Sequence, residues 1–130
     1  MMEDNKLIGL KGKYPKIFPE HFYFECSDGW YDLLDDLCYK LQSYVDDFDN
    51  VEQIVAAQVK EKFGSLRFYI EAGGGDDYIY SLINDAEKKS SSICEDCGEP
   101  GKVQSLGRWL MCRCPICFAK AEEARKNRGY

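Results

Sequence analysis

The chain has 130 residues, a formal net charge of −6 and a hydrophobic content of 45%, which suits a packed domain and excludes global disorder. It holds no run of about 18 apolar residues, so we expect no transmembrane helix, and its start lacks a secretory-signal pattern. Seven cysteines, an odd number, favour a reducing cytoplasm over a disulfide scaffold.

The first 27 residues contain two prolines four positions apart and several aromatic side chains, which predict an extended or looped arm that packs onto the core. His21 is the only histidine and has no second ligand or nucleophile beside it, so we interpret it as a surface or packing residue. An amphipathic helix follows, because apolar residues recur every three or four positions from Trp30 to Phe48. Cys38 lies beside this stripe and is predicted to be a small buried hydrophobe.

A β-hairpin is predicted next, with a first arm over residues 51–62, a type II′ turn at Gly64-Ser65 and a second arm over residues 66–71. This turn places Lys62 opposite Arg67, and puts Ala57 and Phe63 on the core face. The outward face then carries the one concentrated basic surface of an acidic region, here named the basic hairpin face: Lys60, Lys62, Arg67 and Tyr69. Two interpretations stay open, an anion- or partner-binding site and a solvated sheet face whose cations pair with nearby aspartates.

A glycine-rich connector, Gly73-Gly74-Gly75, follows the hairpin, and it is not a phosphate-binding loop because no Gly-Lys-Ser/Thr follows it. A second amphipathic helix is predicted from about Asp77 to Lys89, with Ser90-Ser91-Ser92 as a hinge after it. Two helices and a hairpin predict an α+β fold with an α-β-β-α core, which we assign to residues 1–93.

Two Cys-x-x-Cys pairs organise residues 94–130. Cys94 and Cys97 form the first pair, Cys114 and Cys117 the second, and this spacing is typical of a four-thiolate Zn²⁺ site. Since four thiolates complete a tetrahedral shell and leave no position for an activated water, we expect the zinc to be structural. Cys112 competes with Cys114 as a ligand, but only Cys114 lies two residues from Cys117 in the spacing that forms a knuckle.

The segments between and after the two cysteine pairs indicate which class of zinc finger the chain forms. Gly98 suits a sharp turn after the first pair, and Pro115 favours a helix start within the second. Residues 102–106 and 108–112 are predicted to pair about Gly107, and residues 118–127 to form a helix. This order predicts a treble-clef zinc finger, with a zinc ribbon as the alternative, as a subdomain over residues 94–130.

Several motifs, in this order, resemble a family of small uncharacterised proteins encoded by tailed phages, prophages and bacterial genomes. The motifs are Gly29-Trp30-Tyr31-Asp32-Leu33, then Lys60-Glu61-Lys62-Phe63-Gly64-Ser65-Leu66-Arg67-Phe68-Tyr69, then Cys94-x-x-Cys97-Gly98, and then Trp109. The resemblance spans roughly residues 28–117 and implies a host-cytoplasm setting and an accessory role against host systems. Members close the metal site with Cys or His in the last position, here Cys117, and Cys112 departs from the family's pattern.

Three kinds of binding fit these observations, and no nucleophile–base pair is visible for an enzyme. The first is a non-enzymatic module that binds a host protein, such as part of a defence or regulatory system. The second sequesters a nucleotide or another anion on the basic hairpin face. The third is a nucleic-acid-binding finger, although the first 93 residues carry 18 acidic and 10 basic side chains, which disfavours non-specific nucleic-acid binding. That finger would use cations such as Arg108, Arg113 and Arg125. We expect no membrane partner.

Overall fold

The helices and strands follow the order that the sequence predicts, with one additional helix near the start. The computed structural model describes residues 6–71 and 73–128, so the first five residues of the predicted arm lie outside the described residues. The elements are α1 (Ile8–Lys13), the 3-10 helix η1 (Asp28–Trp30), α2 (Tyr31–Asp47), β1 (Ala56–Lys62), β2 (Ser65–Ile70), α3 (Asp77–Ser90), β3 (Lys102–Leu106), β4 (Trp109–Arg113) and α4 (Pro115–Asn127). Two two-stranded antiparallel sheets together with these helices confirm the predicted α+β class. No helix in the described part of the chain is both long and apolar enough to cross a membrane.

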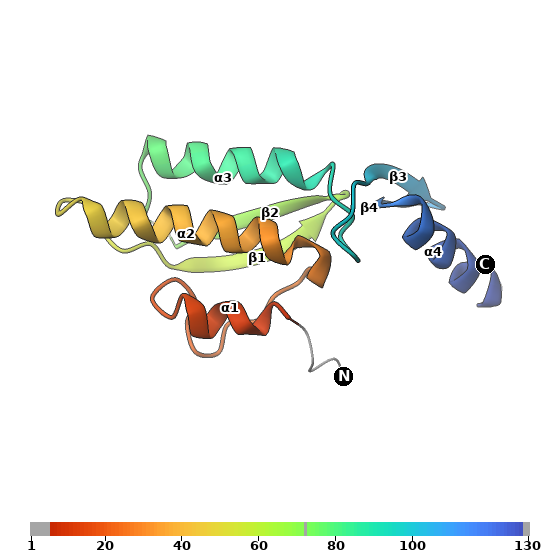
Figure 1. Cartoon of the computed structure of the whole chain (residues 1–130), viewed down its shortest axis with the longest axis horizontal. Helices are drawn as coiled ribbons and strands as arrows, with labels where there is room; N and C mark the ends of the chain where they lie inside the picture. The colour runs from red at the N-terminus through yellow and green to blue at the C-terminus, as the bar shows by residue number, and fades with distance from the viewer. Residues whose placement is uncertain (1–5, 72, 129–130) are drawn as a thin grey trace.

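One core holds α1, α2, α3 and the β1–β2 hairpin together. The helices α2 and α3 lie side by side over one face of this hairpin, and the β3–β4 hairpin and α4 lie beyond the start of α2 (Figure 1). The predicted apolar stripe is buried from Trp30 to Leu41, but Tyr44 and Val45 are half-buried and Phe48 is exposed. Cys38 is buried, as expected. The largest fully buried side chains come from every layer: Leu7, Leu10, Ile17, Trp30, Leu34, Leu41, Ile54, Leu66 and Ile79.

The arm before residue 28 begins with a helix that the proline pattern does not predict. Leu7 and Leu10, three positions apart, are fully buried, which is the weak helical signal at this point. After α1 the chain is fixed to α2, because Lys13 Nζ and Tyr14 Oη donate to the carboxylate of Asp35 at 2.9 Å and 2.6 Å. These hydrogen bonds, first from Lys13 and then from Tyr14, lower the pKa of Asp35.

The turn of the β1–β2 hairpin is Phe63-Gly64, and the prediction of Gly64-Ser65 is wrong. Both turn residues have positive φ, 56° and 83°, as a type I′ turn requires. A bulky residue seldom adopts positive φ, which is why the sequence pattern assigns the turn to the glycine and the residue after it. Here the carboxylate of Glu61 accepts the backbone N–H of Gly64 at 2.7 Å and supports the turn.

The corrected turn moves the strand pairing by two residues and leaves the faces unchanged. Phe63, predicted on the core face, lies exposed at the turn, and a bulge places Ala56 in the core where Ala57 was expected. Because a two-residue shift preserves the side-chain alternation, the basic hairpin face still points away from the core. The pairs on that face are Lys62 with Ser65, Lys60 with Arg67, and Gln58 with Tyr69.

Both edges of this hairpin are covered by other parts of the chain. Along β1, the backbone of Glu25 exchanges two hydrogen bonds with the strand. Along β2, Ser90 Oγ accepts the backbone N–H of Leu66 at 2.8 Å, and Glu87 accepts that of Phe68 at 2.9 Å. Since covered edges do not readily add a strand from another chain, a partner would reach this sheet through the side chains of its outer face.

Candidate metal centre

Four cysteine sulfurs gather between the loop after α3 and the start of α4. The Sγ atoms of Cys94, Cys97, Cys114 and Cys117 all lie within 4.8 Å of one another, and those of Cys97 and Cys114 are 3.6 Å apart. In a tetrahedral shell with a Zn–S distance of about 2.3 Å, the sulfurs lie about 3.8 Å apart. The cluster can therefore hold a metal ion, and it fits a zinc-ribbon subdomain.

The first cysteine pair lies on a tight backbone turn. Gly98 has a φ of 86°, as the sequence predicts for a residue that must turn sharply, and its N–H donates to Cys94 O at 2.9 Å. The N–H of Cys94 in turn donates to Glu99 O at 2.7 Å. These bonds fold residues 94–99 back on themselves, so both sulfurs of the pair point to the same side.

The second pair lies at the first turn of α4. Cys114 is the N-cap of this helix and Pro115 occupies its first turn, which confirms the predicted helix start at Pro115. The Sγ of Cys114 accepts the backbone N–H of Cys117 at 3.3 Å. The helix start therefore fixes both sulfurs and directs the backbone N–H of Cys117 at the sulfur of Cys114.

The environment of each thiol makes their acidities unequal. Burial raises the pKa of the Cys94 thiol, but hydrogen bonds to the backbone N–H groups of Cys114, Cys97 and Asp96 lower it by a larger amount. The net result is a pKa of about 7. Burial, together with the other three sulfurs, raises the pKa of Cys117 well above its ordinary range. Four neighbouring thiolates repel one another, so complete ionisation of the cluster requires a cation among them.

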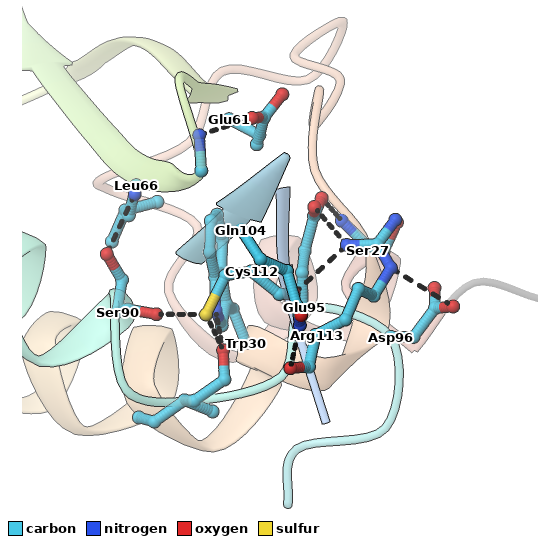
Figure 2. Close-up of polar contacts among 12 residues, drawn as sticks. Ser27, Trp30, Glu61, Leu66, Ser90, Glu95, Asp96, Gln104, Cys112 and Arg113 are labelled. Carbon is cyan, nitrogen blue, oxygen red and sulfur yellow. Dashed lines mark hydrogen bonds and ion pairs between the residues drawn. The ribbon is translucent and has the colours of Figure 1, made fainter. Parts of the chain in front are cut away.

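Cys112 lies outside the cluster. It is fully buried in the main core, and its thiol donates to Ser90 O at 3.4 Å and to Ile93 O at 3.2 Å (Figure 2). Its partner in the strand pair is Val103, and its side chain points away from the four sulfurs toward α3. The competition between Cys112 and Cys114 that the sequence leaves open is therefore resolved in favour of Cys114.

A buried ion pair joins the cysteine cluster to the chain before α2. The carboxylate of Glu95 accepts from Arg113 Nη1 at 3.1 Å and from the backbone N–H of Ser27 at 2.9 Å, and Arg113 Nε lies 3.6 Å from Asp96 (Figure 2). Burial raises the pKa of Glu95, and Arg113 partly offsets that shift. Arg113, a candidate nucleic-acid contact in the sequence analysis, is thus occupied within the fold.

The approach of η1 to the first cysteine pair requires a glycine. The N–H of Gly29 donates to Glu95 O at 2.6 Å, and a Cβ at Gly29 would overlap the backbone carbonyls of Cys94 and Glu95. The neighbouring Trp30 is fully buried, and its Nε1 donates to Ile93 O at 2.9 Å. These contacts form a buried interface between residues 1–93 and 94–130, the two parts into which the sequence analysis divides the chain. The division itself stays a prediction.

The basic hairpin face lies on the side of the sheet that α2 and α3 leave open. Lys60 and Arg67 are directly opposite each other, and neither side chain has an ion-pair or hydrogen-bond partner among residues 6–71 and 73–128. Lys62 Nζ lies over the ring of Phe63, 5.5 Å from its centroid. The aspartates that would neutralise a purely solvated face therefore form no such pairs in this part of the chain. A binding role for the face stays a prediction.

A groove that the sequence does not reveal adjoins this face. It has a volume of about 410 Å³ between the arm and the hairpin, and its lining includes His21, Tyr23, Glu25, Tyr69 and Glu71. His21 is exposed, in agreement with its predicted surface position. The arm and the hairpin are more than 30 residues apart in the sequence, so no local pattern signals the groove.

Comparison of the chain with protein-family models, with curated proteins and with solved structures gives no match. The resemblance to phage and prophage proteins accordingly stays a prediction. The geometry of the cysteine cluster and of the basic hairpin face is what bears on function.

Proposed function

We propose that this chain is a non-enzymatic binding protein with one structural Zn²⁺, and that its basic hairpin face contacts an acidic surface of a host protein. The four-cysteine cluster supports the zinc, because four thiolates fill a tetrahedral shell and leave no position for a reactive water. The free energy of zinc binding would then stabilise a segment that has a small core of its own.

One observation carries the binding part of the proposal: Lys60 and Arg67 lie side by side on an open sheet face and form no ion pair with any residue that the structure describes. Like charges directly across a strand pair are mildly destabilising, and a face selected only for folding would tend to avoid them. An acidic partner surface removes this repulsion and forms charge-assisted hydrogen bonds with both side chains. Tyr69, half exposed on the same face, adds aromatic contact area.

The setting of this function follows from the motifs. The resemblance to phage and prophage proteins supports a host protein as the partner, and a host defence or regulatory system as the target. The position of the second cysteine pair, at the first turn of α4 after the β3–β4 hairpin, supports the treble-clef arrangement over the zinc ribbon.

The second candidate function is sequestration of a nucleotide or another small anion. It is favoured by the groove of about 410 Å³ beside Tyr69, since ligand sites commonly have volumes of a few hundred Å³. Glu25 and Glu71 also line this groove, however, and their carboxylates repel an anion. We therefore rank a macromolecular partner, which contacts the flat basic face, above a small anionic ligand.

The zinc proposal is tested by measuring metal content and stability together. The purified chain should contain one zinc ion, and Cys114→Ser should lose it and unfold at lower temperature. Cys38→Ser, a buried cysteine outside the cluster, is the matched control and should keep the metal. A chain that contains no zinc, and whose stability neither zinc nor a chelator changes, would contradict the proposal.

The binding proposal is tested by charge reversal. Native mass spectrometry of the chain purified from its host should show a protein partner, and Lys60→Glu with Arg67→Glu should remove that partner while zinc content and stability are retained. Lys120→Glu with Lys126→Glu makes the same charge change on exposed α4 and should retain the partner.

The outcomes of this experiment separate the candidates. Loss of binding only in the α4 variant favours a contact through the finger, including nucleic-acid binding. Release of a nucleotide from wild type after denaturation, and not from the hairpin variant, favours the second candidate. If the partner binds both variants normally, the basic hairpin face is a solvated sheet face that takes no part in binding.

A further inference from the structure

The end of α2 and the start of α3 lie at the opposite end of the molecule from α4 (Figure 1). A second groove is lined by residues of these two helices and by Phe48, which follows α2. It has a volume of about 470 Å³ and is lined by Tyr39, Tyr44, Phe48 and Tyr78 together with Lys40 and Asp47. The ring of Tyr44 packs between two others, with centroids 5.2 Å from Phe48 and 4.5 Å from Tyr78. We call this set of four rings the aromatic groove.

The rings of the aromatic groove are far more exposed than folding alone favours. Tyr39 is 65% exposed, Phe48 52% and Tyr78 50%. Single exposed aromatics are ordinary, but several around one concave surface form a patch that is typical of a binding site. The hydroxyl of Tyr44 donates to Asp76 at 2.6 Å, which holds the central ring in a fixed position.

The charge around the groove is negative. The carboxylate of Asp47 makes no hydrogen bond or ion pair with any residue in the described ranges, 6–71 and 73–128. Lys40 is the only cation in the lining, and its ammonium is already paired with Asp36 at 2.9 Å. Asp46, also at the end of α2, accepts only a neutral hydrogen bond from Gln42.

The helix itself adds to this negative potential. α2 ends at Asp47 with Asp46 beside it, and its last turn contains no basic residue. The C-terminal end of a helix carries a partial negative charge, so carboxylates there are unfavourable and a cation is favourable. A positive charge at the end of α2 would therefore be stabilised both by the helix dipole and by the two aspartates, and the last turn of the helix contains no basic residue.

We propose that the aromatic groove binds a lysine or arginine side chain from a basic segment of a protein partner. The faces of Tyr39 and Tyr78 would contact the cation, and Asp47 and the end of α2 would neutralise it. An apolar group could pack against the rings but would leave the charge of the Asp47 carboxylate without a partner. An anion would be repelled by Asp47 and by the negative end of the α2 dipole. The groove is separate from the basic hairpin face and has the opposite charge, so the inference does not depend on the proposed function.

The test uses a fluorescent hexa-arginine peptide, whose binding to the full chain is followed by anisotropy at two salt concentrations. We expect salt-sensitive binding, and shifts of the Tyr39 and Tyr78 ring signals in NMR spectra recorded during the same titration. Asp47→Asn combined with Tyr39→Leu should weaken binding about tenfold. Both side chains are exposed, so the variant should fold normally.

Two controls separate this site from general attraction to an acidic protein. Glu123→Gln changes the net charge equally on exposed α4 and should leave binding unchanged. Trp109→Leu removes an exposed ring of β4, at the other end of the molecule from the groove, and should also have no effect. The proposal is overturned if all variants bind hexa-arginine equally, if Glu123→Gln weakens binding as much as the double variant, or if only an uncharged apolar peptide shifts the ring signals.

Discussion

The contact between η1 and the first cysteine pair gives the sharpest prediction for stability. In Gly29→Ala, the new Cβ would lie closer than 3.0 Å to backbone atoms of Cys94 and Glu95, where no flexible side chain can move aside. Overpacking of this kind costs about 1–3 kcal/mol, and loss of the hydrogen bond from Gly29 to Glu95 O adds about 1 kcal/mol. We therefore expect the free energy of unfolding to fall by about 2–4 kcal/mol, and Tm by roughly 6–15 °C for a chain of this size.

The assay is urea and thermal unfolding with excess zinc, followed by the fluorescence of the buried Trp30. Because the strain bears on Cys94, which carries one of the four thiols of the cluster, zinc should also be lost to a competing chelator at a lower chelator concentration. Gly9→Ala is the control: this glycine lies in helix α1 with open space around it, and alanine there should be neutral or stabilise by about 0.5–1 kcal/mol. The argument is refuted if Gly29→Ala unfolds within about 0.5 kcal/mol of wild type and keeps its zinc affinity.

Three other changes test separate parts of the structure. Cys112→Ser should keep the full zinc content while lowering stability by about 1–2 kcal/mol, since it places a more polar group in the core; loss of zinc would show that Cys112 is a ligand. Ser90→Ala removes the acceptor of the Leu66 N–H at the edge of β2 and should cost about 1–3 kcal/mol in urea unfolding, whereas Ser91→Ala should cost less than 0.5 kcal/mol; equal costs would contradict the role assigned to this edge contact. The lowered pKa of Asp35 means that its hydrogen bonds stabilise the fold above its ordinary pKa of about 4 and are lost as pH falls through the folded-state pKa. Asp35→Asn should therefore be less stable than wild type at pH 6, with a difference that shrinks below about pH 4; a difference that does not depend on pH would be inconsistent with this linkage.

Local patterns in the sequence were sufficient for the helices α2, α3 and α4 and for the cysteine cluster, but not for α1. The burial of the α2 stripe follows from residues three and four positions apart, which share a helix face whatever packs against it. The two cysteine pairs are equally local, since a two-residue gap and a tight turn bring two sulfurs to one side. The short hairpin about Gly107 was also predicted, with its second strand one residue later, at Trp109 to Arg113.

The turn of the β1–β2 hairpin shows where local rules fail. Gly64 satisfies both the predicted and the observed turn, and only the second requires Phe63 to adopt positive φ. The hydrogen bond that the Gly64 N–H donates to the Glu61 carboxylate and the packing of Gly64 against Val103 of β3 support the observed turn. Val103 is 39 positions from Gly64 in the sequence, so a propensity-based choice could not include it.

What the sequence by itself determined is therefore the order of the helices and strands from α2 onward, the metal-binding spacing and the outward direction of the basic hairpin face. The tertiary structure alone decided which cations are paired and which rings surround a groove, whereas the four cysteines that it brings together are those that the spacing predicts. Arg113 is neutralised by Glu95, whereas Lys60 and Arg67 have no ion-pair partner in the described ranges, although all three are strand residues. The physical reason is distance: periodicity and spacing act over a few residues, but the contacts that pair a charge or close a pocket join segments that only the folded core brings together.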